Sequence, residues 1–298
     1  MNKTARHVGL DPAKISGGGG GQPRKGFFTD TSICIGCKAC EVACKEWNNI
    51  PEDGLDWLGF SYDNTGSLGA SSWRHVAFIE QSIAATRTGI LSATSAPDIS
   101  DLRWLMSSDV CKHCTEAGCL DVCPTGSLFR TEFGTVVVQD DICNGCGYCI
   151  AACPFGVIER REGSGETKNV GLAQKCTLCY DRLGAGMTPA CAQACPTESI
   201  HFGNLDELRS QARRRVEKLH LEGTHAARLY GEDPNDGVGG AGAIFLLLDE
   251  PEVYGLPPNP AVATRKLGQM WKQAGMAALA LLIGAAAASI ERQADAKE

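Results

Sequence analysis

Sixteen cysteines are the residues of this 298-residue chain with the clearest capacity for chemistry. They form four groups of four, and no cysteine lies outside a group. The groups are Cys34, Cys37, Cys40, Cys44; Cys111, Cys114, Cys119, Cys123; Cys143, Cys146, Cys149, Cys153; and Cys176, Cys179, Cys191, Cys195. Because thiolates bind soft metal centres, this recurrence indicates repeated metal sites, with longer spacings inside the second and fourth groups.

The spacing inside the first and third groups, C-x2-C-x2-C-x3-C, favours iron–sulfur clusters. Structural zinc sites usually combine two C-x2-C pairs that are well separated in sequence. Three cysteines within seven residues instead suit three irons of a cubane and leave the fourth sulfur pointing elsewhere. In two-cluster bacterial ferredoxins that fourth cysteine ligates the other cluster. Zinc and disulfides are the alternatives, and Lys45 stands where such a run usually has proline.

The number of cysteines also predicts what the clusters could do. Four cysteines for each of four clusters would cap every iron with sulfur, which predicts four [4Fe-4S] clusters. This count argues against the open iron of a radical enzyme and against a three-iron cluster. The sequence has no nucleophile elbow and no paired-carboxylate motif. We therefore expect no catalytic residues in this chain and a role in moving electrons.

Polar residues beside the cysteines could tune such clusters. His113, inside "CKHC", is expected to face solvent or to tune a cluster by its charge, and not to bind iron. His75 and His201 lie in strand-like runs and are expected to be structural. Four lysines adjoin cysteines, and each either raises a cluster potential or simply faces water. These are Lys38, Lys45, Lys112 and Lys175.

Short elements must position the cysteine groups. The runs 75–81, 134–139 and 198–203 are rich in apolar and β-branched residues and predict strands. Apolar residues at helical spacing predict an exposed amphipathic helix over 205–222. The glycines of 237–242 match G-x-G-x-x-G, but they precede a strand-like run and open no helix, so we reject a dinucleotide site. The mixture predicts an α+β fold.

The overall composition excludes some function classes. A formal net charge of −7 argues against nucleic acid as the main partner, because phosphate binding needs a basic excess. The first 25 residues have no apolar core of signal-peptide length, so we expect no export signal in this chain. Five consecutive glycines in this segment predict a flexible arm over residues 1–25. Dense cysteines then indicate metal insertion in a reducing compartment.

The cysteine-rich segments resemble those of a known family. They read "CIGCKACEVACKEWN", "SSWRHVAFIEQ", "VCKHCTEAGCLDVCPTGSLF", "DDICNGCGYCIAACPFGVI", "KCTLCYDRLGAGMTPACAQACPTESI" and "VYGLPPNP". The chain resembles the beta (iron–sulfur) subunit of membrane-bound respiratory formate dehydrogenases, one of the four-cluster ferredoxin-type subunits of molybdopterin oxidoreductases. The similarity extends from about Gly26 to the C-terminal tail.

This resemblance implies how the cysteines share four [4Fe-4S] clusters. Groups one and four would supply two clusters, and groups two and three the other two. Site a would use Cys34, Cys37, Cys40 and Cys195; site b Cys44, Cys176, Cys179 and Cys191; site c Cys111, Cys114, Cys119 and Cys153; and site d Cys123, Cys143, Cys146 and Cys149.

The same resemblance implies two nested ferredoxin-like domains. Residues 26–100 with 170–204 would form the outer domain, and 101–169 the inner one. A C-terminal extension over 205–262 and a single C-terminal helix over 263–298 would follow. The fold class expected is therefore α+β with two nested [4Fe-4S] domains.

The resemblance also implies partners in anaerobic respiration. A catalytic alpha subunit would oxidise formate at a molybdenum or tungsten bis-pterin centre, and electrons would pass through this chain to a cytochrome b gamma subunit and to quinone. The alternatives are the equivalent subunit of a hydrogenase or of a sulfur-compound oxidoreductase, and a zinc-stapled interaction module.

The C-terminal tail contains a segment that could span a membrane. Ala274 to Ile290 gives 17 consecutive uncharged residues, the lower limit for a spanning helix. The alternative is a helix buried against a partner. The resemblance favours a membrane anchor and a complex in the inner (cytoplasmic) membrane. It implies a periplasmic cluster domain exported together with the alpha subunit, and a cytoplasmic complex is the alternative.

Overall fold

A four-stranded sheet joins the two ends of the cluster-bearing region. The computed structural model describes residues 23–53, 59, 62–63, 65–82, 102–163 and 165–295. Most of the predicted N-terminal arm, residues 1–22, lies outside these described residues, and β1 begins inside its predicted range, at Lys25. The chain divides between Val262 and Ala263 into two compact units.

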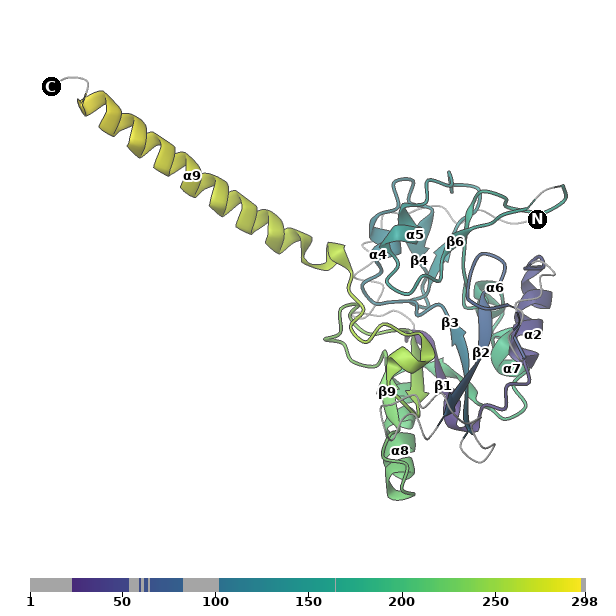
Figure 1. The fold of residues 1–298 in the computed structure, drawn as a ribbon. Coiled ribbons are helices and arrows are strands. Elements are labelled where there is room, and N and C mark those ends of the chain that lie inside the picture. Colours follow the sequence, from purple (N-terminus) through teal and green to yellow (C-terminus); the bar gives the residue numbers. More distant parts are fainter. Residues whose placement is uncertain are drawn as a thin grey trace. The chain divides into compact units, whose positions relative to one another are not determined.

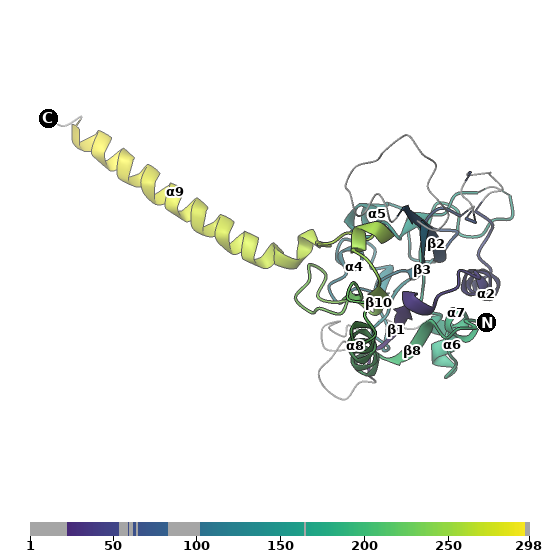
Figure 2. The same cartoon turned by 60° about the horizontal axis from the view of Figure 1, so that its bottom comes forward.

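The sheet has the strand order β8-β1-β10-β9. Figure 1 labels β1 and β9, and Figure 2 labels β8, β1 and β10. β1 (Lys25–Asp30) pairs in parallel with β10 (Ala243–Leu247) and antiparallel with β8 (Ile200–Asn204). β9 (Arg228–Tyr230) closes the other edge, antiparallel to β10. The sheet therefore fastens the segment before the first cysteine group to segments that follow the last one.

The two faces of the sheet bury different partners because successive side chains of a strand alternate between them. Phe28 of β1 packs with Ile244 of β10 against the amphipathic helix α8 (Leu205–Leu221), which lies beside the sheet in Figures 1 and 2. Phe27, on the opposite face, packs with cysteines of several groups. β10 is buried along its whole length, as expected for an interior strand paired on both sides.

The remaining elements of the cluster-bearing unit are mostly short. Antiparallel pairs are formed by β2 (Arg74–Ser82) with β3 (Leu102–Val110), β4 (Leu128–Arg130) with β5 (Val136–Val138), and β6 (Glu159–Arg160) with β7 (Ala173–Gln174). The helices are α2 (Ala39–Asn48), α4 (Gly118–Asp121), α5 (Tyr148–Ala152), α6 (Tyr180–Gly184) and α7 (Ala190–Gln193), with the 3-10 turns η1 (Thr31–Ile33) and η3 (Pro251–Tyr254). The predicted strands over 75–81, 134–139 and 198–203 and the helix over 205–222 are confirmed to within a few residues.

The second unit contains η4 (Ala263–Lys266) and α9 (Leu267–Asp295). The segment Ala263–Ala287 is long and apolar enough to cross a membrane, and no part of its most apolar stretch is buried in the described structure. A bilayer core requires about 20 apolar residues in helical form. The predicted α+β class with a single C-terminal apolar helix is thus confirmed.

Gly26 provides a test of the sheet. A methyl group there would meet the Gly242 carbonyl oxygen and would lie 2.8 Å from the Leu205 side chain. We expect Gly26→Ala to lower the free energy of unfolding by about 1–3 kcal/mol, because the backbone that it meets is fixed by the hydrogen bond from the Phe27 N–H to the Gly242 carbonyl. Gly203, its partner across β1 and β8, has only an ordinary 3.9 Å neighbour and supplies the control. Thermal unfolding of both variants measures the difference, and equal melting temperatures would contradict this account.

Candidate iron–sulfur sites

Three cavities in the first unit are each lined by four cysteines. One is lined by Cys34, Cys37, Cys40 and Cys195. A second is lined by Cys111, Cys114, Cys119 and Cys153. A third is lined by Cys123, Cys143, Cys146 and Cys149. In each cavity, cysteines from two different sequence groups face the same space.

The four other cysteines also lie together. Cys44, Cys176, Cys179 and Cys191 are all buried. Burial raises the pKa of Cys44 well above its ordinary value, and charge on Cys176, Cys191 and Cys179 raises it further. Twelve cysteines thus line three cavities, and the remaining four are buried and close enough for their charges to act on Cys44.

The thiols surround spaces and do not converge on a point. Among the described residues, no three His, Cys, Asp or Glu side chains are close enough to hold a single metal ion. A tetrahedral zinc site requires four ligand atoms about 2 Å from one ion. Four thiols around a cavity instead suit a cluster with several metal atoms, so the donor set fits [4Fe-4S].

Helical geometry separates the last two cysteines of the first group, which lie in different sets of four. Cys40 and Cys44 lie on α2 four residues apart, which is about 6 Å along the helix axis. Cys40 lines the first cavity, whereas Cys44 lies with the buried set. The pairs Cys119 and Cys123, Cys149 and Cys153, and Cys191 and Cys195 repeat this step at α4, α5 and α7. α2 packs on α7, and α4 packs on α5.

The loops between the cysteines curl through left-handed backbone conformations. Gly36 and Lys38 have φ of 66° and 59°, and Gly145 and Gly147 have φ of 68° and 82° at the equivalent places of the third group. Alternation of this kind turns successive N–H groups toward one side, a concavity that favours anions and iron–sulfur clusters. A backbone N–H bond to sulfur is formed where Leu178 donates to Cys176 Sγ at 3.3 Å.

The thiols are held in surroundings that disfavour charge. Burial raises the pKa of Cys119 to about 12 and that of Cys149 to about 11, and neighbouring cysteines add to both shifts. As free thiols these side chains would stay protonated at neutral pH. Iron binding requires thiolates, so loading of the sites should release protons.

Hydroxyl groups near the cysteines were missed by the sequence analysis. Ser127 Oγ lies 3.3 Å from Cys123 Sγ, and Ser108 Oγ lies 3.2 Å from Cys40 Sγ. Although burial acts against it, hydrogen bonding from Ser127 contributes to lowering the pKa of Cys123 to about 7. Ser127 lies within one turn of its cysteine and could have been noticed. Ser108 is 68 residues from Cys40, so only the fold brings them together.

His113 differs from its prediction. The residue is only 2% exposed, and it lines the cavity of Cys111 and its partners. Its Nδ1 accepts a hydrogen bond from the Val136 N–H at 3.1 Å. Burial, followed by the charge of Lys175, holds the pKa of His113 well below its ordinary value. The ring is therefore buried, so the expectation that it faces solvent was wrong, and its lowered pKa disfavours an effect through its own charge.

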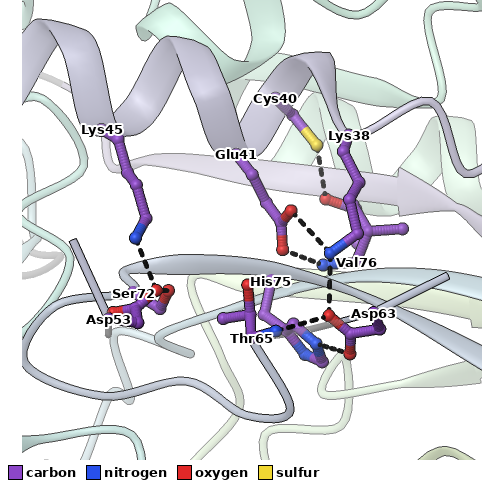
Figure 3. A network of polar contacts seen from close by, with 11 residues as sticks. Lys38, Cys40, Glu41, Lys45, Asp53, Asp63, Thr65, Ser72, His75 and Val76 are labelled. Carbon is purple, nitrogen blue, oxygen red and sulfur yellow. Dashed lines mark hydrogen bonds and ion pairs between the residues drawn. The ribbon is translucent and has the colours of Figure 1, made fainter. Parts of the chain in front are cut away.

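His75 and His201 have the structural roles expected of them. Figure 3 shows His75 beside Asp63, with 2.5 Å between Nε2 and the carboxylate. His201 stacks on Phe28 with 5.4 Å between ring centroids. Both contacts fix neighbouring segments of the fold.

Two of the four lysines form ion pairs near the surface. Lys38 lies 2.8 Å from Asp63 and 3.0 Å from Glu41 (Figure 3). Lys45 lies 2.5 Å from Asp53, in the same network of contacts (Figure 3). Carboxylates that neutralise these lysines reduce their long-range effect on a nearby cluster.

The other two lysines are buried, which excludes for them the alternative that they simply face water. Lys112 is 1% exposed, pairs with Asp109, and lies 5.1 Å from the centre of the Phe245 ring. Lys175 is 2% exposed and donates hydrogen bonds to the carbonyls of Val136 and Cys176. Both line the cavity of Cys111 and its partners.

Comparisons with known proteins agree with this chemistry. Family models described as "4Fe-4S dicluster domain" match residues 33–127 and 102–205. The chain is 39% identical over 249 residues to the nitrate-inducible formate dehydrogenase iron–sulfur subunit of Escherichia coli, covering 82% of this chain and 76% of that one. It is 41% identical over 237 residues to the formate dehydrogenase iron–sulfur subunit of Haemophilus influenzae, covering 78% and 68%. The B subunit of anaerobic dimethyl sulfoxide reductase from Escherichia coli is 33% identical over 187 residues, covering 62% and 76%.

Proposed function

We propose that this chain, which belongs to the family of formate dehydrogenase iron–sulfur subunits, carries electrons through four [4Fe-4S] clusters between a catalytic subunit and a cytochrome b partner. Membership makes it the iron–sulfur electron-transfer subunit of a formate-dehydrogenase-type complex. The proposed catalytic partner holds a molybdenum or tungsten bis-pterin centre where formate is oxidised. This chain would have no catalytic site of its own.

The observation that carries this proposal is the gathering of cysteines from different sequence groups around shared cavities. It supports the four ligand sets a to d defined above. When bound, each cluster supplies a reversible one-electron store. The chain's own residues would hold the clusters apart at fixed positions, keep the cysteines of set b away from water, and set the charge and the hydrogen bonds around sulfur.

Burial and proximity support the order a–b–c–d for electron passage. The cysteines of set b are all buried, whereas set a includes the exposed Cys37 and set d the exposed Cys146. Cys176 of set b and Cys111 of set c are close enough for charge on Cys111 to raise the pKa of Cys176, after burial. Sites b and c would therefore meet in the interior, and sites a and d would face the partners.

The nested division into an outer domain (26–100 with 170–204) and an inner domain (101–169) remains our proposal. It is supported by the packing of α2 on α7 in the first and of α4 on α5 in the second. We further propose that α9 anchors the complex in the inner membrane, with the clusters on the periplasmic side. The apolar length of Ala263–Ala287 supports the anchor.

Metal analysis of the purified complex tests the proposal. We expect about 16 iron and 16 sulfide per copy of this chain, after subtraction of the partners' contribution, because four cubanes each contain four of both. A colourless chain loaded with zinc would overturn the proposal and favour an interaction module.

Similarity to the B subunit of dimethyl sulfoxide reductase supports a second candidate, the equivalent subunit of a sulfur-compound oxidoreductase. Identification of the catalytic polypeptide that co-purifies with this chain separates the two candidates. Reduction of the clusters by formate supports the first. Oxidation of the reduced clusters by a sulfur compound, without any response to formate, supports the second.

A further inference from the structure

Arg74, at the start of β2, is a buried cation with no acidic partner among the described residues. Its side chain is 1% exposed. Nη1 donates to Ser108 Oγ at 3.0 Å and to the Ser108 carbonyl at 3.3 Å, whereas Nε and Nη2 have no hydrogen-bond partner. The guanidinium also lies 4.8 Å from the centre of the Phe27 ring. A buried charge is costly unless another group compensates it.

Cysteines of two proposed cluster sites would, as thiolates, supply opposite charge to Arg74. Burial by itself would lower the pKa of Arg74, but charge on four surrounding cysteines raises it above its ordinary value. These are Cys191, Cys40, Cys176 and Cys44. Cys40 belongs to site a, and the other three belong to site b. Ser108 links Arg74 to Cys40, because its hydroxyl contacts both Arg74 Nη1 and Cys40 Sγ.

We propose that Arg74 is an internal counter-charge shared by sites a and b, and that it raises the reduction potential of both. This inference rests on the proposed function, because it requires clusters at those two sites. The Nε–H and Nη2–H groups are donors available to sulfur, and Ser108 and Phe27 position the guanidinium. Arg74 acts on the two sites through its positive charge and is not an iron ligand.

The direction of the effect follows from charge balance. One-electron reduction adds one negative charge to a site, and no bond to Arg74 forms or breaks. The guanidinium keeps its proton, because arginine stays charged in proteins. Its attraction for the site is thus stronger after reduction than before, and burial protects this attraction from screening by salt. Cluster potentials depend on net charge and on hydrogen bonds to sulfur.

An electron paramagnetic resonance redox titration of the purified complex tests this inference. We expect Arg74→Gln to disfavour reduction at two of the four clusters by tenfold or more in equilibrium constant, which is about 59 mV for a one-electron couple. The other two potentials should not move. Arg161→Gln is the matched control, since Arg161 is also buried but donates to the Ala70 carbonyl and has Asp140 as its nearby charge.

If Arg74→Gln fails to retain clusters, Arg74→Lys provides the test, because it keeps the positive charge. Retained iron and near-normal potentials in the Lys variant, against loss of iron in the Gln variant, support the role of charge. Loss of iron in both, or four unmoved potentials in an iron-replete Gln variant, overturns it. The wild-type complex is measured alongside. Fewer than four clusters there would contradict the proposed function, whereas four clusters with no shift in the variant would contradict only the inference about Arg74.

Discussion

Cys176→Ser should interrupt electron flow through the chain. Cys176 belongs to the buried set b, and its charge environment includes Cys111 of set c, so it lies at the proposed junction between the two cluster pairs. A serine hydroxyl is a poor substitute for a thiolate toward iron, and water cannot easily fill this interior position. We expect iron to fall from about 16 to about 12 per chain, because one cubane is lost.

The kinetic effect should exceed the ~10–100-fold loss that is typical when only an outer partner of a metal ligand is removed. Formate-dependent quinone reduction measures this loss of turnover. Formate should reduce the clusters on one side of the missing cluster and should not reduce those on the other side. Ser210→Ala, on the exposed face of α8, is the control because its hydroxyl donates to the Asp206 carbonyl of its own helix. Full iron content with unchanged turnover in Cys176→Ser would remove Cys176 from the ligand set.

Deletion from Gln273 onward should release the complex from membranes. The deletion removes Ala274 to Ile290, the uncharged stretch of the apolar helix α9. The cluster-bearing unit ends at Val262, so its iron content should remain. Flotation of vesicles after a high-pH wash measures attachment. A complex that stays bound after this deletion would place the anchor in another subunit.

Two further variants separate a membrane anchor from a helix that packs on a partner. A shorter deletion, from Glu291 onward, leaves Ala274 to Ile290 intact and should stay bound. Leu281→Arg places a charge near the middle of the apolar segment, where insertion of an arginine costs about 2.5–3.5 kcal/mol. We expect this variant to bind vesicles more weakly. Normal vesicle binding together with loss of the cytochrome partner would instead indicate a protein contact.

The cluster chemistry could be predicted from the sequence because ligand type and short-range spacing are local properties. A C-x2-C-x2-C-x3-C run determines which sulfurs can reach one centre, and the four-residue step on α2 separates Cys44 from Cys40 by about 6 Å along the helix whatever follows along the sequence. Spacing did not predict which cysteines of distant runs share a cluster. That grouping was implied by the family resemblance, because no local feature links Cys34 to Cys195.

Only the tertiary structure decided what surrounds the cysteines. β1 pairs with β8, and this brings Cys34, four residues after β1, to the same cavity as Cys195, five residues before β8. Whether a polar side chain is buried depends on such distant pairings, because each covering element comes from another part of the chain. His113 and Lys175 therefore could not be distinguished by sequence from solvent-facing residues, yet both are buried. Arg74 directly precedes the predicted strand over 75–81 and belongs to a segment that carries the family resemblance, but only the fold places its charge beside thiols of two sequence groups apart from its own segment. Spacing along the sequence determined which residues could bind iron, and long-range packing decided which charges would lie beside them.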